Sequence, residues 1–195
     1  MRFESQNGGA MDTLTPRKAA QAGLSRSSLL RAARNGQYDR IARGIYRDSN
    51  APEANWDWLE AATRRPEATI CLTSALAHHD LIDDIPTSLD IAIGRGTRIP
   101  ASEGSINWHT FAADTFTLGR TIIPITGSDQ TIGLYSPERC IADAFRLRSE
   151  IGYETGIEAL REWLRQGGKP ATMAALALRL PRAKKPLLDA LAVLT

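Results

Sequence analysis

Residues 15–47 read TPRKAAQAGLSRSSLLRAARNGQYDRIARGIYR, and this stretch decides the fold of the N-terminal part of the chain. Thr15 is placed to cap a helix that opens with a proline, and Gly23 supplies the left-handed residue that ends it. Ser25 is placed to cap a second helix, which ends at Asn35-Gly36. The stretch therefore predicts two short helices joined by a glycine turn.

A basic two-stranded ribbon is predicted directly after the second helix. Residues 38–41 and 45–47 have the composition of strands, and they flank a tight Arg43-Gly44 turn. The order of helix, turn, helix and ribbon is the outline of a winged helix-turn-helix, for which DNA is the expected target.

The two faces of the second helix differ in character. At about 100° per residue, one face is apolar and carries Leu29, Leu30 and Ala33. The opposite face carries Ser27, Ser28 and Arg31, with Arg34 at the border. Short hydroxyls can donate to base edges and phosphates, and arginine can bind guanine through two parallel hydrogen bonds. The outward face is therefore suited to reading a major groove.

Further basic side chains lie on either side of this helix. Arg17 and Lys18 begin the preceding helix, where they can meet the phosphate backbone. The ribbon adds Arg40, Arg43 and Arg47, which suit backbone or minor-groove contact.

Charge is unevenly distributed along the chain. The formal net charge is only +2, but residues 11–48 carry eight Lys or Arg against three Asp. Residues 49–110 carry four basic against nine acidic side chains, and residues 111–195 carry eleven against nine. A basic module attached to an acidic segment can bind a polyanion at one end without coating DNA along its whole length.

Two other interpretations of the basic helix stay open. It can be a solvated helix face, or the winged helix can dock a protein. The agreement of caps, turn, helix and ribbon favours DNA over the first. The outward Arg and Ser side chains argue against the second, because protein-binding faces tend to have apolar centres.

Composition predicts a globular cytoplasmic protein. No apolar run approaches the roughly 20 residues needed to span a membrane. The start lacks the apolar centre of a signal peptide, and residues 1–14 are expected to be a disordered or irregular arm, with Met11 as an alternative initiator. Cys71 and Cys140 are far apart and lie in apolar contexts, which favours reduced buried thiols. No cofactor motif is present.

The fold class expected is α+β. Residues 15–50 are assigned to the winged helix-turn-helix domain, and residues 51–195 to a domain with a small mixed or antiparallel sheet and several helices. The strands are expected at residues 89–93, 106–110, 115–118, 121–125 and 130–134. The helices are expected at residues 55–65, at a Ser74-capped SALAHHDL, and at 136–148, 155–165, 172–180 and 185–194.

The candidate enzymatic residues lack the spacing of a catalytic or metal site. The adjacent side chains of His78 and His79 point about 100° apart on a helix and cannot clamp one metal ion, and His109 stands alone in a strand. An acidic cluster, Asp80, Asp83 and Asp84, can hold Mg²⁺ in a nuclease, but no Glu-x-Lys pair follows it in a strand. Neither Gly94-Arg95-Gly96 nor Gly127-Ser128 precedes the Lys-Ser/Thr start of a phosphate-loop helix. We expect no enzyme and no metal site.

The chain from Thr15 to Thr195 resembles the AbiEi-type antitoxins of type IV abortive-infection toxin–antitoxin systems, which act in phage defence. The segments that carry the resemblance are AGLSRSSLLRAARNGQYDRIARGIYR, SALAHHDL, IPIT and YSPERCIADAFRLRSEIGYETGIEALREWLRQG. The last run is the most specific, because its Ser-Pro start, Ile-Ala-Asp centre and Phe-Arg-Leu-Arg exit are similar to the family's C-terminal domain.

The resemblance implies a transcriptional repressor that binds inverted repeats in its own promoter and counteracts a nucleotidyltransferase-like toxin without a stable complex. It implies a monomer or weak dimer that binds DNA cooperatively. By matching position, it assigns DNA contact to Arg17, Lys18, Ser25, Arg26, Ser27, Ser28, Arg31, Arg34, Arg40 and Arg43.

One departure from the family concerns the segment before Thr15, where a full helix is usual and this chain has MRFESQNGGAMD. Either the module is trimmed to two helices and the wing, or its first helix is irregular. A trimmed module would depend on the larger domain for its core. Other functions also stay open: a nuclease guided by the winged helix, a repressor that senses a small ligand, and an antidote that binds only protein.

Overall fold

The computed structural model describes residues 13–195, apart from the side chain of Pro181. The chain divides into two compact units. The first takes the described residues up to Pro66, with Pro100–Ile106 and Ile123–Ile132. The second takes Glu67–Ile99, Asn107–Ile122 and Gly133–Thr195. Residues 51–66 therefore belong to the same unit as the N-terminal module. The expectation that residues 15–50 fold as an independent domain remains a prediction.

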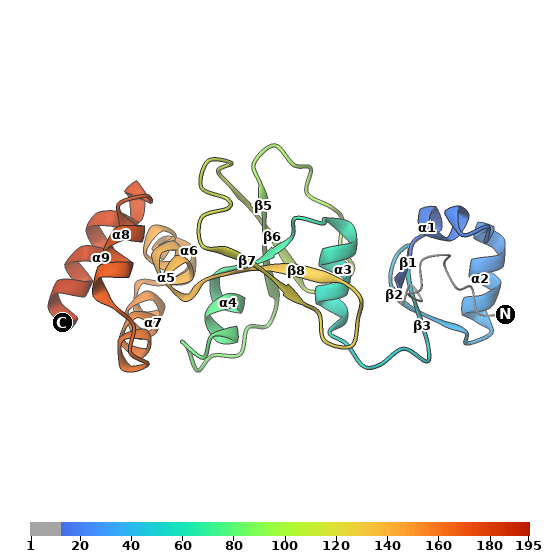
Figure 1. Ribbon diagram of the computed structural model, residues 1–195, viewed down its shortest axis with the longest axis horizontal. Helices are drawn as coiled ribbons and strands as arrows, with labels where there is room; N and C mark the ends of the chain where they lie inside the picture. The colour runs from blue at the N-terminus through green and yellow to red at the C-terminus, as the bar shows by residue number, and fades with distance from the viewer. Residues whose placement is uncertain (1–12) are drawn as a thin grey trace. The chain divides into compact units, whose positions relative to one another are not determined.

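The N-terminal module spans residues 13–48 and is called the winged-helix module below (Figure 1). Its elements are β1 (Thr13–Leu14), α1 (Pro16–Gln21), α2 (Arg26–Arg34), β2 (Tyr38–Ala42) and β3 (Ile45–Asp48). The strands form an antiparallel sheet in the order β1-β3-β2, and Thr13 pairs with Arg47. The predicted helices and ribbon are confirmed, and β1 adds a strand that we did not expect.

Local signals fix the ends of the two helices. The Lys18 amide donates to the Thr15 hydroxyl at 3.2 Å, and the Ser28 amide donates to the Ser25 hydroxyl at 3.1 Å. A side-chain cap of this kind contributes about 1 kcal/mol of helix stability. Gly23 adopts a φ of 78°, which only glycine enters without strain, and the chain turns there into α2.

The core of the winged-helix module joins the helices to the sheet. Leu14, Ala19, Leu29 and Tyr46 pack together, and burial of a leucine such as Leu29 contributes about 1.5–3 kcal/mol. Leu30 is 37% exposed, so its expected place on the packing face is wrong. The prediction of a disordered or irregular arm over residues 1–14 is wrong at its last two positions, because Thr13 and Leu14 are buried strand residues. Residues 1–12, including Met11, lie outside the described residues.

The rest of the first unit is built around α3 (Trp56–Arg64), which Asn55 caps. Glu60 on this helix is almost fully buried and binds Arg64 at 2.6 Å. Its carboxylate also accepts the amides of Glu103 and Gly104, at 3.2 and 3.3 Å. The helix thereby holds the loop that carries Glu103.

A five-stranded sheet has the strand order β6-β5-β4-β8-β7. Its strands are β4 (Thr69–Ile70), β5 (Leu89–Gly94), β6 (Ile106–Phe111), β7 (Arg120–Pro124) and β8 (Thr131–Tyr135). Strand β4 is antiparallel to β5 and parallel to β8, so the sheet is mixed. The predicted α+β class is confirmed, although β4 was not among the expected strands.

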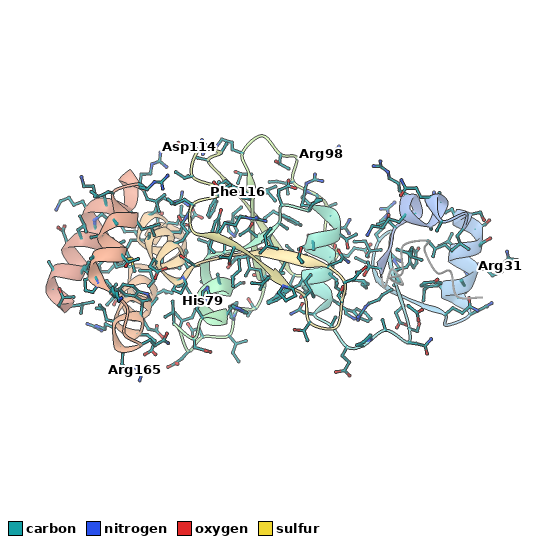
Figure 2. The ribbon with its side chains drawn as sticks, in the orientation of Figure 1. Arg31, His79, Arg98, Asp114, Phe116 and Arg165 are labelled. Atoms are coloured by element: carbon teal, nitrogen blue, oxygen red, sulfur yellow. The ribbon has the colours of Figure 1, made fainter. Side chains whose placement is uncertain are left out.

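The expected strand at residues 115–118 is wrong, since this segment forms turns. The carbonyls of Thr115 and Leu118 accept hydrogen bonds from the guanidinium of Arg139, and the carbonyl of Phe116 accepts one from Tyr135 Oη at 2.7 Å. Buried side chains thus take the place of a neighbouring strand. Figure 2 shows Phe116 in this segment.

The helices of the second unit are α4 (Leu72–His78), α5 (Pro137–Arg146), α6 (Arg148–Ile151), α7 (Tyr153–Arg165), α8 (Pro170–Ala177) and α9 (Pro181–Leu194). Figure 1 shows α5 to α9 gathered as one group. The prediction that Ser74 caps α4 is wrong, because Ser74 lies inside this helix. Its hydroxyl instead donates to the Ser88 carbonyl and accepts the Asp90 amide. None of the helices in the described part of the chain is long and apolar enough to cross a membrane.

Candidate nucleic-acid interface

The N-terminal end of α2 carries a connected group of serines. The Ser25 hydroxyl lies 2.9 Å from the hydroxyls of both Ser27 and Ser28, besides accepting the Ser28 amide. These hydroxyls hold one another in place at the end of the helix where positive partial charge favours an anion. The arrangement suits a phosphate or a base edge near the start of α2.

The ten residues assigned to DNA contact are accessible. Lys18 and Ser28 are half-buried, and the other eight are exposed. Arg31 extends from α2 into solvent (Figure 2). Arg26 lies nearer to the packed face of α2 than Ser27 and Ser28 do, because it is about 60° around the helix from the buried Leu29. The contact role of these residues stays a prediction.

One of the wing arginines already has an anionic partner. Arg40 Nη2 donates to both carboxylate oxygens of Glu103, at 3.0 and 3.1 Å. Both side chains are about half exposed, at 53% and 49%. A phosphate that binds Arg40 must therefore compete with this carboxylate, a contact that the local sequence pattern does not reveal.

Arg47 is a structural residue of the wing, and its expected DNA contact is wrong. Its side chain is only 4% exposed, and Nη2 donates to the Gly127 carbonyl at 2.7 Å. Gly127 has a φ of 77°, and a Cβ at this position would collide with the Glu53 carbonyl oxygen. Glycine is therefore required where the chain turns beneath Arg47.

The three histidines do not form a common site. His79 Nε2 lies 2.8 Å from the Tyr135 carbonyl, which fixes the ring at the end of α4 (Figure 2). His109 has a partner that the sequence did not suggest, because its Nε2 lies 2.9 Å from Asp90 Oδ1. No group of three His, Cys, Asp or Glu residues suited to a metal ion occurs among residues 13–195.

The acidic cluster after α4 is tied to α7. The Asp83 amide donates to Glu158, and Gln166 donates to the Asp80 carbonyl at 3.0 Å. The loop between them is thus anchored by its backbone.

Asp90 is one of the residues that line a hollow of about 470 Å³. Besides His109, it accepts hydrogen bonds from Thr73 at 2.5 Å and from Asn107 at 3.5 Å. Burial raises the pKa of Asp90, but the hydrogen bonds from His109 and Thr73 outweigh burial and lower it. The carboxylate therefore stays ionised. The apolar side of the hollow includes Ile82, Ile85, Pro86 and Ile151.

The two thiols are not reactive groups in this fold. Cys71 and Cys140 are both buried and free. Burial raises the pKa of each thiol well above its ordinary value.

Comparison with known proteins identifies the winged-helix module. Residues 9–47 match the family described as "Transcriptional regulator, AbiEi antitoxin". The winged-helix module is therefore similar to this family, which confirms the resemblance over this part of the chain and is consistent with a regulator that binds DNA.

A solved structure of another protein shares the fold over most of the chain. The crystal structure of RV2827C protein from Mycobacterium tuberculosis is 17% identical, with a TM-score of 0.50, and the match covers 92% of this chain and 75% of that one. No curated protein matches the sequence.

Proposed function

We propose that this chain is an antitoxin that represses its own toxin–antitoxin operon by binding repeats in the promoter. The observation that carries the proposal is a capped helix, α2, with exposed Arg31 and Arg34 beside a basic wing. The family match over residues 9–47 supports DNA binding.

In the proposed complex, residues 25–34 enter a major groove. The serine hydroxyls and arginines of α2 contact base edges and phosphates, as recognition helices do. Arg17 and Lys18 from α1, together with Arg40 and Arg43 from the wing, bind the phosphate backbone and fix the register. Copies on neighbouring repeats then occlude the promoter.

The test is a salt-titrated gel shift on the DNA upstream of the gene, with a scrambled fragment as competitor. Retention of the upstream fragment at about 150 mM salt, with the scrambled fragment released, is the expected result, because non-specific binding weakens steeply with salt. The double variant Arg31→Ala/Arg34→Ala should lose this retention. Arg161→Ala/Arg179→Ala, which removes the same charge from the second unit, is the matched control. Equal affinity for both fragments would contradict the proposal.

We further propose that the chain counteracts a nucleotidyltransferase-like toxin without forming a stable complex with it. We assign this activity to the region after residue 50, on the resemblance of its C-terminal run to the family. Co-expression with the toxin tests it: the Arg31→Ala/Arg34→Ala variant should still protect cells while promoter repression is lost. Loss of both activities together would argue against this division.

A ligand-sensing repressor is the second candidate, and the Asp90 hollow favours it. A pocket with apolar walls and a few placed polar groups is typical of small-molecule sites. A compound that binds there should change promoter affinity in the gel shift, and Asp90→Asn should remove that response. A nuclease would degrade the DNA during incubation with Mg²⁺.

A further inference from the structure

Three arginines from separate helices surround one hollow in the second unit. Arg146 ends α5, Arg148 begins α6 and Arg182 lies in the first turn of α9. With Ser149 they line a space of about 420 Å³. No carboxylate is among the described side chains that line it.

The Arg146 guanidinium is held in a fixed orientation. Its Nε donates to Asp143 Oδ1 at 2.9 Å, and its Cζ lies 4.9 Å from the centre of the Phe111 ring. Its Nη2 is buried without a hydrogen-bond partner among the described residues. Arg148 is oriented as well, because Nη1 donates to the Phe145 carbonyl at 3.2 Å. Two of the three cations are thus placed before any ligand arrives.

The positive charge at this hollow exceeds the local negative charge. Asp143 is the carboxylate that pairs with Arg146, but its other oxygen binds Arg139 at 2.8 Å. One carboxylate therefore serves two guanidiniums. The first turn of α9 holds no acidic residue, although the positive end of a helix dipole favours one. Arg182 places a cation at the N-terminal end of α9, where the helix dipole favours an anionic side chain.

We propose that this hollow, called the arginine pocket below, binds the phosphate group of a small phosphorylated ligand. Guanidinium groups present paired N–H donors that match the oxygens of a phosphate, and the Ser149 hydroxyl can donate another hydrogen bond. A doubly charged anion offsets most of the excess positive charge at this hollow. The volume falls in the range of small-molecule pockets and exceeds the needs of a bare phosphate, so a phosphate monoester such as a nucleotide fits best.

The site is separate from the winged-helix module and does not rest on the proposed DNA binding. All four lining residues belong to the second unit. Arg148 and Arg182 are exposed, so their substitution tests the site without disturbing a buried core.

Isothermal titration of the full-length chain at about 150 mM salt tests the proposal, with adenosine 5′-monophosphate, inorganic phosphate and adenosine as probes. Binding of the monophosphate with a Kd below about 1 mM is expected, because several charge-assisted hydrogen bonds contribute. Arg148→Gln and Arg182→Gln should each weaken it about tenfold, whereas Arg179→Gln, an exposed arginine outside the pocket, should leave it unchanged. Tighter binding of the monophosphate than of phosphate assigns the site to phosphate esters, and equal binding assigns it to inorganic phosphate.

Three outcomes would overturn the proposal. The first is adenosine binding as tightly as its monophosphate, and the second is no binding of either phosphate probe. The third is binding that survives both pocket substitutions but is lost in Arg31→Ala/Arg34→Ala, which would place the phosphate on the winged-helix module.

Discussion

Replacing Glu103 with glutamine should increase the affinity of this protein for DNA. In the free protein the Glu103 carboxylate occupies Arg40, which we assign to the phosphate backbone. The substitution keeps the size of the side chain and leaves the backbone amide of residue 103 bound to Glu60. It therefore removes the competing charge with little effect on the loop.

The size of the effect follows from the exposure of the pair. With both side chains about half exposed, the ion pair contributes about 0.2–1 kcal/mol. Releasing Arg40 from it should strengthen DNA binding by roughly 1.5- to 5-fold. If Arg40 then neutralises one more phosphate, the slope of log K against log salt becomes steeper by about 0.9.

The assay is a binding titration on promoter DNA by fluorescence anisotropy at several salt concentrations. Glu53→Gln is the matched control, because it removes an exposed carboxylate from the same unit that is not paired with Arg40. In an Arg40→Ala background, the Glu103 substitution should have no further effect, since the interaction it breaks is already absent.

If Glu103→Gln leaves both the affinity for DNA and the salt slope unchanged, Glu103 does not compete with DNA for Arg40. This competition is also refuted if the gain persists in the Arg40→Ala background, because the carboxylate would then act through general repulsion of DNA.

Three further predictions concern the second unit. Arg139→Met should lower the free energy of unfolding by about 3–5 kcal/mol, because Asp143 loses a buried partner, and a loss below about 1 kcal/mol in urea titration would contradict this. Cys71 and Cys140 should react with a thiol reagent only in denaturant, since burial raises the pKa of both thiols; rapid labelling of the native protein would show that one is accessible. Asp90 has a pKa below the unfolded value of about 3.9, so its contribution to stability is present above that pH and is lost as pH falls through the folded pKa. Asp90→Asn should flatten the pH dependence of stability in this acidic range, and an unchanged profile would exclude the carboxylate as its source.

The winged-helix module could be predicted because its signals are local. Thr15, Ser25 and Gly23 set helix ends through contacts within a few residues. The exposed placement of Leu30 was missed, because a period of 3.6 residues puts it at the border of the apolar face.

The parts that sequence reasoning missed depend on contacts between distant residues. Strand β4 has only two residues and exists because both neighbouring strands pair with it. The Arg40–Glu103 and Asp90–His109 pairs likewise have no local pattern. The assignments of DNA contact, including Arg31 and Arg34, remain predictions.

The position of β4 between β5 and β8 has a consequence for biosynthesis. The strands and helices of the winged-helix module have all been synthesised once Asp48 has left the ribosome, although Arg47 still lacks Gly127. In the sheet, Thr69 must wait for Gly133 and Ile70 for Leu134. Until then the nascent chain exposes an unpaired strand edge in the middle of its future sheet. The elements of the winged-helix module can thus be present on a chain whose second unit is still a target for chaperones and proteases.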